Sequence, residues 1–126
     1  VQERKQFGKR LSQMQNTQFQ LADMHTRMQA AQFLVYSAAM KKQAFTEAAL
    51  AGKKAPAYSM DAAMAKLFAA EAASDVTRRA VQLFGGYGYT REYPVERMMR
   101  DAKITEIYEG TSEVQRMVIA SNLGVK

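Results

Sequence analysis

The 126-residue sequence contains no cysteine, which excludes disulfide bonds and thiolate chemistry. Its single histidine, His25, excludes a metal site built from several histidines, so we expect no bound metal. Only two prolines and seven glycines interrupt the chain, and residues that favour helices are abundant. The alternation of polar and apolar residues that is typical of strands is nearly absent. These features predict an all-α protein.

No apolar run reaches the roughly 18 residues that a membrane-spanning helix needs, so we expect no membrane span. The opening residues, VQERKQ, are polar and charged, unlike a secretory signal peptide, and they lack an initiating methionine. We therefore expect a processed chain or a part of a longer protein. The length suits a single domain over residues 1–126.

The chain carries a net charge of +6, from 18 basic and 12 acidic residues. A basic balance is typical of nucleic-acid-binding proteins. Here, however, the lysines and arginines are scattered along the chain, and no stripe of them alternates with aromatic residues that could stack on bases. We therefore expect no nucleic-acid partner, and we interpret the excess as solvated surface with a local anion site at most.

The longest helical pattern runs from about Leu11 to Ala51, where apolar residues recur mostly at steps of three or four, or multiples of these. A helix of this length extends roughly 60 Å. Gly52 and Pro56 follow it and are expected to end it. Helices of this kind are stabilised by packing rather than by propensity alone, so we expect neighbouring helices along most of its length.

The remaining sequence predicts three further helices. The second begins near Ser59, which we expect as its N-cap, and stops at the glycines of residues 85–88. The third covers about 95–103. The fourth covers about 112–123, where Ser112 and Gln115 can form a capping box. The four segments predict an antiparallel helical bundle, thin enough that the long helix is expected to expose apolar residues on more than one face.

Glu109 is the first candidate for chemistry, because it lies between Tyr108 and Gly110 just before the fourth helix. A carboxylate at this position can simply be an anion favoured by the helix dipole. It can also be a general base on a loop, with Gly110 leaving room for a ligand to approach. The pattern alone leaves both interpretations open.

Two other segments can bind a ligand. Residues 85–88, Gly-Gly-Tyr-Gly, follow a helix rather than a strand, which argues against a dinucleotide-binding fingerprint. They are either a helix stop or a stretch of backbone that lies flat against a ligand. Arg4 precedes the first helix and, with free helix N–H groups, can form a phosphate site; the alternative is a solvated basic end.

Three stretches together resemble a known family. They read ERKQFGKRL (3–11), AVQLFGGYGYTREYPVERMMRDAK (80–103) and ITEIYEGTSEVQR (104–116). In this order they are similar to the C-terminal domain of the acyl-CoA dehydrogenases, most of all to the short-chain (butyryl-CoA) members. The likeness covers residues 3–124. It implies the C-terminal helical bundle of a longer flavoenzyme, without the first helix of that bundle, and assembly as a homo-oligomer, either a dimer or a tetramer.

The resemblance also implies roles for individual residues. Glu109 corresponds to the catalytic base, and Tyr108 and Gly110 lie beside the substrate. Some branched-chain members carry their base on an earlier helix, but Glu109 occupies the usual position. The cofactor is FAD, with its phosphates and adenosine bound across a subunit boundary. The residues implied to contact FAD are Arg4, Lys5, Gln6, Gln15, Gln82, Leu83, Phe84, Gly85, Gly86, Thr111, Ser112 and Glu113.

The activity implied by the resemblance is oxidation of a short-chain acyl-CoA to the trans-2-enoyl-CoA, a step of fatty-acid β-oxidation. An electron-transfer flavoprotein is the expected electron acceptor. The expected location is the cytoplasm in a bacterium or the mitochondrial matrix in a eukaryote. Two alternatives stay open: a non-catalytic helical domain that serves only oligomerisation, and a related enzyme that acts on other acyl-CoAs or on nitroalkanes.

Overall fold

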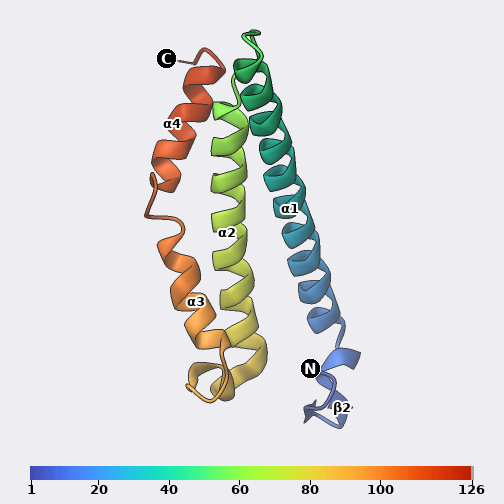
Figure 1. Ribbon diagram of the computed structural model, residues 1–126. Coiled ribbons are helices and arrows are strands. Elements are labelled where there is room, and N and C mark those ends of the chain that lie inside the picture. Colours follow the sequence, from blue (N-terminus) through green and yellow to red (C-terminus); the bar gives the residue numbers. More distant parts are fainter. Residues whose placement is uncertain (126) are drawn as a thin grey trace.

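The computed structural model describes residues 1–125, and it is almost entirely helical (Figure 1). The predicted all-α fold is confirmed, with one small addition at the N-terminus, a two-stranded hairpin. In chain order the elements are β1 (Lys5–Gln6), β2 (Lys9–Arg10), the 3₁₀ turn η1 (Leu11–Gln13), α1 (Gln15–Leu50), α2 (Ser59–Phe84), the 3₁₀ turn η2 (Gly85–Tyr89), α3 (Val95–Ile104) and α4 (Ser112–Asn122).

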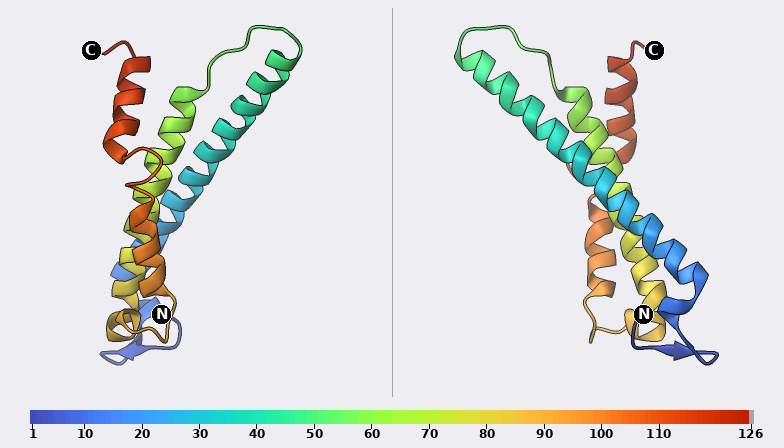
Figure 2. Two further views of the ribbon diagram at one scale, coloured as in Figure 1. Left: turned by 60° about the vertical axis from the view of Figure 1, so that its left-hand side comes forward. Right: turned by 90° about the vertical axis from the view of Figure 1, so that its right-hand side faces the viewer.

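The long helices lie in a row with α2 in the middle (Figure 1). Helix α1 packs antiparallel on one side of α2, and α3 and α4 follow one another along the other side. Figure 2 shows that α1 crosses α2 at an angle and diverges from it toward the connection between them. Helix α2 therefore supplies nearly all the packing surface of the other three helices. None of the helices in residues 1–125 combines the length and hydropathy needed to cross a lipid bilayer.

The core consists mainly of alanine. The buried apolar residues of the described chain are Met24, Ala38, Ala63, Ala65, Ala70, Ala72 and Ala102. None of the described large side chains is completely buried. Alanine lets helix backbones approach closely, but each residue removes little apolar area from water. The bundle therefore has close helix contacts and a thin core.

A large apolar surface remains on the outside of α1. Phe33, Tyr36 and Met40 are 68%, 55% and 72% exposed. Phe33 follows the buried Met24 by about two and a half helical turns, which places it on the face opposite α2. The total accessible surface is 9309 Å², whereas a compact monomer of this mass exposes about 6,700 Å². The expectation that the long helix is apolar on more than one face is confirmed.

The first helix ends where the sequence predicts and starts later than predicted. Gly52 has φ +66°, and the amides of Gly52 and Lys53 bond the carbonyls of Ala49 and Ala48 at 3.1 and 2.8 Å. This is a Schellman motif, which satisfies the last carbonyls of the helix. The predicted start at Leu11 is wrong, because residues 11–13 form a tighter 3₁₀ turn and Met14 is extended, so α1 begins at Gln15.

Both predicted N-caps are wrong by one residue. Ser59 is the first helical residue of α2, and the cap position is Tyr58, whose side chain makes no cap hydrogen bond. At α4 the cap is Thr111, whose Oγ1 accepts a hydrogen bond from the Val114 amide at 3.3 Å. Ser112 is therefore inside the helix, and the expected capping box with Gln115 does not form. At α4 the neighbouring residues Thr111 and Ser112 can each act as the cap, and the backbone geometry selects Thr111.

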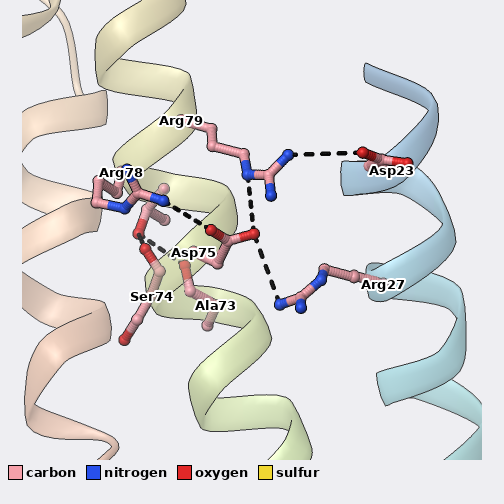
Figure 3. A network of polar contacts seen from close by, with 8 residues as sticks. Asp23, Arg27, Ala73, Ser74, Asp75, Arg78 and Arg79 are labelled. Atoms are coloured by element: carbon pink, nitrogen blue, oxygen red, sulfur yellow. Dashed lines mark hydrogen bonds and ion pairs between the residues drawn. The ribbon is translucent and has the colours of Figure 1, made fainter. Parts of the chain in front are cut away.

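An ionic network joins α1 to α2 around Asp75 (Figure 3). Its carboxylate lies 2.9 Å from Arg79 Nε, 2.9 Å from Arg78 Nη2 and 3.6 Å from Arg27 Nη1 of α1. Asp23 of α1 reaches Arg79 at 3.8 Å. Burial of the Asp75 carboxyl raises its pKa, but the hydrogen bonds from Arg79 and Arg78 and the nearby charges outweigh burial, so the pKa is lowered overall.

We predict that Asp75→Asn lowers the free energy of unfolding by about 1–2 kcal/mol near pH 7, because three arginines lose the negative charge and one of the two acceptor oxygens that they share. A lowered folded-state pKa stabilises the fold above the ordinary aspartate value of 3.8 and loses this effect as the pH falls through the folded value. The difference between variant and parent should therefore shrink as the pH falls below 3.8. The measurement is urea unfolding at one fixed protein concentration across this pH range.

The matched control is Asp101→Asn, which removes an exposed carboxylate outside the network. It should change stability by less than about 0.5 kcal/mol. Equal stability of Asp75→Asn and the parent near neutral pH would show that the network contributes nothing to the fold.

Candidate functional site

The predicted site residues form two clusters at different positions along α2. One cluster surrounds Glu109 and is contacted by Lys66 of α2; the other contains Arg4, which contacts Phe84 at the end of α2. Lys66 and Phe84 lie on one continuous helix, so at about 1.5 Å per residue they are separated by about 27 Å. A single chain therefore presents two separate candidate surfaces.

Glu109 lies in a tight, strained turn between α3 and α4. Its φ is +53° and that of Gly110 is +90°, a region that a glutamate rarely adopts. The carbonyl of Ile104 accepts hydrogen bonds from the amides of Ile107 and Tyr108, at 2.9 and 3.0 Å. The turn is thus continuous with the end of α3. Strained non-glycine residues of this kind cluster at functional sites.

Side chains from two helices bind the backbone of this turn. Lys66 Nζ of α2 donates to the Gly110 carbonyl at 2.6 Å. Gln115 Nε2 of α4 donates to the Gly110 and Glu109 carbonyls at 3.2 and 3.3 Å. A Cβ added to Gly110 would lie 2.7 Å from Gln115 Nε2. The position therefore requires glycine on both conformational and steric grounds.

The side chain of Glu109 is exposed. Ile107 and Tyr108 beside it are each 51% exposed. The chain thus presents a carboxylate next to half-exposed apolar side chains. The backbone that carries this carboxylate is held by the hydrogen bonds from Lys66 and Gln115. A fixed and accessible carboxylate can accept a proton from a ligand bound against this surface.

Thr111, Ser112 and Glu113 continue directly from the turn into α4. Ser112 is buried, its amide donates to the Glu106 carbonyl at 3.0 Å, and its hydroxyl has no partner among residues 1–125. Glu113 is exposed. Its pKa is lowered by hydrogen bonds from its own backbone amide and from the Thr111 hydroxyl. The polar groups at the start of α4 therefore have hydrogen-bond partners within the chain, apart from the Ser112 hydroxyl.

The second cluster joins residues that are far apart in sequence. Arg4 Nη1 donates to the Phe84 carbonyl at 3.0 Å. Gly85 has φ +65°, and a Cβ there would lie 2.7 Å from Arg4 Nη1, so the guanidinium rests on bare backbone. Gly86 faces open space. A groove of about 620 Å³ runs beside Arg4, Leu83 and Phe84. The predicted residues Arg4 and 82–86 are thus brought together.

The N-terminal hairpin, β1 and β2, carries Lys5 and Gln6, which belong to the same predicted cluster as Arg4. Lys5 pairs with Arg10 and Gln6 with Lys9 in antiparallel register. Phe7 and Gly8 form the connecting turn with φ +51° and +76°, the conformation of a two-residue type I′ hairpin. Lys5 and Gln6 are exposed, as are Gln15 at the start of α1 and Gln82. The sequence did not indicate this hairpin, because Phe-Gly is not a usual type I′ pair.

The geometry of the second cluster fits an anionic phosphate. Beyond its bond to Phe84, the Arg4 guanidinium makes no hydrogen bond with residues 1–125, so further N–H groups can bind an oxyanion. Glycine backbone at 85 and 86 allows a flat ligand to approach. No group of carboxylates and histidine within the described residues could hold a metal ion. A nucleotide cofactor with phosphates is therefore compatible with this surface.

Lys66 and Gln115 are the site residues that the sequence analysis missed. Both act on backbone carbonyls, and Lys66 lies 44 positions before its partner. One signal was available: Lys66 is an isolated charge in the otherwise apolar stretch AAMAKLFAA (62–70). A charge inside such a helix face usually has a specific partner.

Comparison with known proteins identifies the family. Residues 1–124 match the family described as "Acyl-CoA dehydrogenase, C-terminal domain". A short-chain specific acyl-CoA dehydrogenase of Clostridium acetobutylicum is 56% identical over 98% of this chain and 30% of its own length. Its counterpart in Megasphaera elsdenii is 54% identical over 96% of this chain and 29% of its own length. The chain belongs to the acyl-CoA dehydrogenase family, and it spans about 30% of the length of these relatives.

Solved structures agree with this assignment. Butyryl-CoA dehydrogenase from Megasphaera elsdenii superposes with a TM-score of 0.84 at 53% identity, covering 97% of this chain and 29% of the other. The same score and identity are found for a chain in a structure described as an electron transferring flavoprotein of Acidaminococcus fermentans, covering 97% and 30%. A structure described as the FAD complex of PigA gives a TM-score of 0.84 at 29% identity, covering 98% and 30%.

We predict that Gly110→Ala lowers the free energy of unfolding by about 1–3 kcal/mol, because an alanine at φ +90° is strained and its Cβ displaces Gln115. Gly86→Ala is the control, since a Cβ at Gly86 meets nothing within 4 Å and its φ is not left-handed. Denaturant unfolding of both variants at one protein concentration measures the effect. A Gly110→Ala protein as stable as the Gly86→Ala protein would rule out a fixed left-handed turn.

Proposed function

We propose that this chain supplies the catalytic base and part of the cofactor site of an acyl-CoA dehydrogenase that oxidises a short-chain acyl-CoA to the trans-2-enoyl-CoA. The observation that carries the proposal is the accessible Glu109 on a left-handed turn that is bound by side chains of α2 and α4. The identity of 56% to a short-chain specific relative supports the choice of substrate class. On this proposal residues 1–126 are the C-terminal domain of a longer flavoenzyme.

Glu109 takes the α-proton of the thioester on this proposal. The α-hydrogen of a thioester is weakly acidic, so its removal needs a base held at a fixed position. The C–H electron pair stays with the substrate and becomes part of the new C=C bond as the β-hydrogen leaves with its own electron pair. When bound, FAD supplies the acceptor for that hydride. Gly110 and Tyr108 flank the substrate beside the base.

The two clusters are proposed to serve different cofactor molecules. Thr111, Ser112 and Glu113 adjoin Glu109 and lie along the flavin that reacts there. Residues 4–6, Gln15 and 82–86 form the second cluster, whose contact point on α2, Phe84, lies about 27 Å from Lys66 along the helix. There Arg4 and bare glycine backbone suit phosphates and adenosine. This separation supports the expectation that the second cluster binds the FAD of a neighbouring subunit.

Assembly as a homo-oligomer, a dimer or a tetramer, follows from the same proposal. The exposed aromatic face of α1 and the excess of about 2,600 Å² over a compact monomer are what a large subunit interface would cover. An electron-transfer flavoprotein is the proposed electron acceptor. The proposed location is the cytoplasm in a bacterium or the mitochondrial matrix in a eukaryote.

We predict that the 126-residue chain self-associates at micromolar concentration, because an uncovered apolar face of this size is unfavourable in water. Phe33→Glu combined with Met40→Lys should shift the population toward monomer, whereas Lys53→Glu with Lys54→Glu on the connection after α1 should not. Sedimentation velocity over a range of concentrations measures this. A folded parent chain that stays monomeric throughout would contradict the prediction.

The alternative from another class is a non-catalytic helical domain that serves only oligomerisation. The exposed face of α1 favours it for the chain by itself. The natural gene product that carries these residues would then show no flavin absorbance, whereas the proposed enzyme would. A second alternative is a related enzyme that acts on other acyl-CoAs or on nitroalkanes. Measuring how fast each class of substrate reduces the flavin distinguishes it from the proposed enzyme.

We predict that Glu109→Gln in the natural gene product leaves flavin and acyl-CoA binding largely intact and slows flavin reduction by about 10²-fold or more. Glutamine matches glutamate in shape but accepts no proton. The measurement is anaerobic mixing with butyryl-CoA while flavin bleaching is followed. Glu92→Gln, at an exposed position before α3, is the control and should react like the parent. Reduction of the Glu109→Gln enzyme within a few-fold of the parent rate would place the base elsewhere.

A further inference from the structure

Lys66 is an unusual residue for its place on α2. It is half-buried, and its helix neighbours Ala63, Ala65 and Ala70 belong to the alanine core. Lysine is seldom buried without a partner, because its ammonium group loses hydration. In this structure the partner is a backbone carbonyl, that of Gly110, at 2.6 Å. The side chain thus spans from the central helix to the turn that carries Glu109.

The contacts fix two consecutive peptide groups. Lys66 binds the carbonyl of Gly110, and Gln115 binds this carbonyl and that of Glu109. Glu109 and Gly110 both have positive φ, so relaxation of either one into the right-handed region would rotate these carbonyls away from their donors. A hydrogen bond from a charged donor is stronger than one between neutral groups. Lys66 therefore opposes relaxation of the turn more strongly than Gln115 does.

We propose that Lys66 is a positioning residue for Glu109: its ammonium group holds the Glu109–Gly110 turn in the left-handed conformation and thereby sets the direction of the carboxylate toward the substrate. The inference rests on the proposed function, in which Glu109 is the base. Lys66 itself touches neither substrate nor cofactor in this assignment, and it acts only through the backbone of the turn.

The other polar contacts of the region leave this role to Lys66. Lys103 of α3 pairs with Glu106 at 2.5 Å, and Arg116 of α4 pairs with Glu71. These pairs link side chains, and neither reaches the carbonyls of residues 109 and 110 among the described contacts. Only Lys66 and Gln115 donate to them within the described residues. Removing Lys66 therefore leaves the left-handed turn with the two longer bonds from Gln115.

The test compares Lys66→Met with Lys54→Met in the natural gene product. Methionine retains the unbranched apolar stem and removes the ammonium group, and Lys54 is an exposed lysine without an ion pair in residues 1–125. For Lys66→Met we expect the flavin to be retained, KM for butyryl-CoA to change by less than about threefold, and the limiting rate of flavin reduction to fall by about 10- to 100-fold. Lys54→Met should match the parent.

Two further measurements separate positioning from a general structural role. Hydrogen exchange of the peptide covering residues 104–113 should be faster in Lys66→Met than in Lys54→Met, while exchange in α1 stays unchanged; this readout requires no activity. In a Glu109→Gln background, Lys66→Met should cause no further loss of flavin reduction, because the lysine acts through the base. If Lys66→Met does not fold, Gln115→Met tests the same set of hydrogen bonds to the carbonyls of residues 109 and 110. We then expect the same changes in exchange and flavin reduction, with a smaller loss of the limiting rate.

The outcomes are distinct. An additive loss in the Glu109→Gln background, a rise in KM at unchanged limiting rate, or unchanged exchange over 104–113 would each overturn the positioning role. Full activity of Glu109→Gln by itself would instead overturn the proposed function, and the exchange measurement would still decide whether Lys66 holds the turn.

Discussion

The whole arrangement depends on the packing of three helices against a single one, α2, through alanine. Because α1 lies on one side of α2 and α3 and α4 on the other, α2 is the common partner that fixes their positions. Alanine contacts allow close approach but are smooth and shallow, so they do little to fix how far one helix slides along another. Polar contacts between the helices fix their relative positions along the axis here.

Ion pairs connect α2 to each side at defined heights. Asp75 binds Arg27 of α1 in the middle of the bundle, and Asp61 binds Lys41 near the start of α2. On the other side Glu71 binds Arg116 of α4. A pair that is exposed on both sides, such as Arg116 with Glu71, adds little stability by itself, whereas the carboxylates of Asp75 and Asp61 are largely buried. The placement of these pairs is better explained as setting the register of helices whose apolar contacts are small and similar.

The sequence predicted the helices well, because their pattern is local. Period, composition and the glycine at 52 were enough to place the end of α1, and the apolar outer face of that helix could be read from its residues. The cap of α4 was misplaced because Thr111 and Ser112 are both suitable cap residues until the backbone selects one. The cap of α2 was misplaced because Tyr58, whose side chain makes no cap hydrogen bond, gives no capping signal in the sequence. The hairpin at residues 5–10 was missed because its turn, Phe7–Gly8, lacks the usual residues.

The candidate site was predictable only in part. Glu109 and Arg4 stood out as charged residues next to glycine or a helix start. The contact of Arg4 with Phe84 joins residues 80 positions apart, and that of Lys66 with Gly110 joins residues 44 positions apart. Such contacts follow from the path of α2 rather than from any local pattern. The left-handed conformation of Glu109 is likewise a property of the closed turn, not of the glutamate.

Helix α2 also sets the distance and the relative orientation of the two clusters. Both are attached to one uninterrupted helix, at Lys66 and at Phe84. Inserting or deleting one residue between these points would shift the clusters by about 1.5 Å along the axis and rotate them by about 100° relative to each other. Substitutions in this span leave the spacing intact, whereas a change in its length would not. The distance between the two clusters therefore constrains the number of residues in the segment 67–83, whichever residues occupy it.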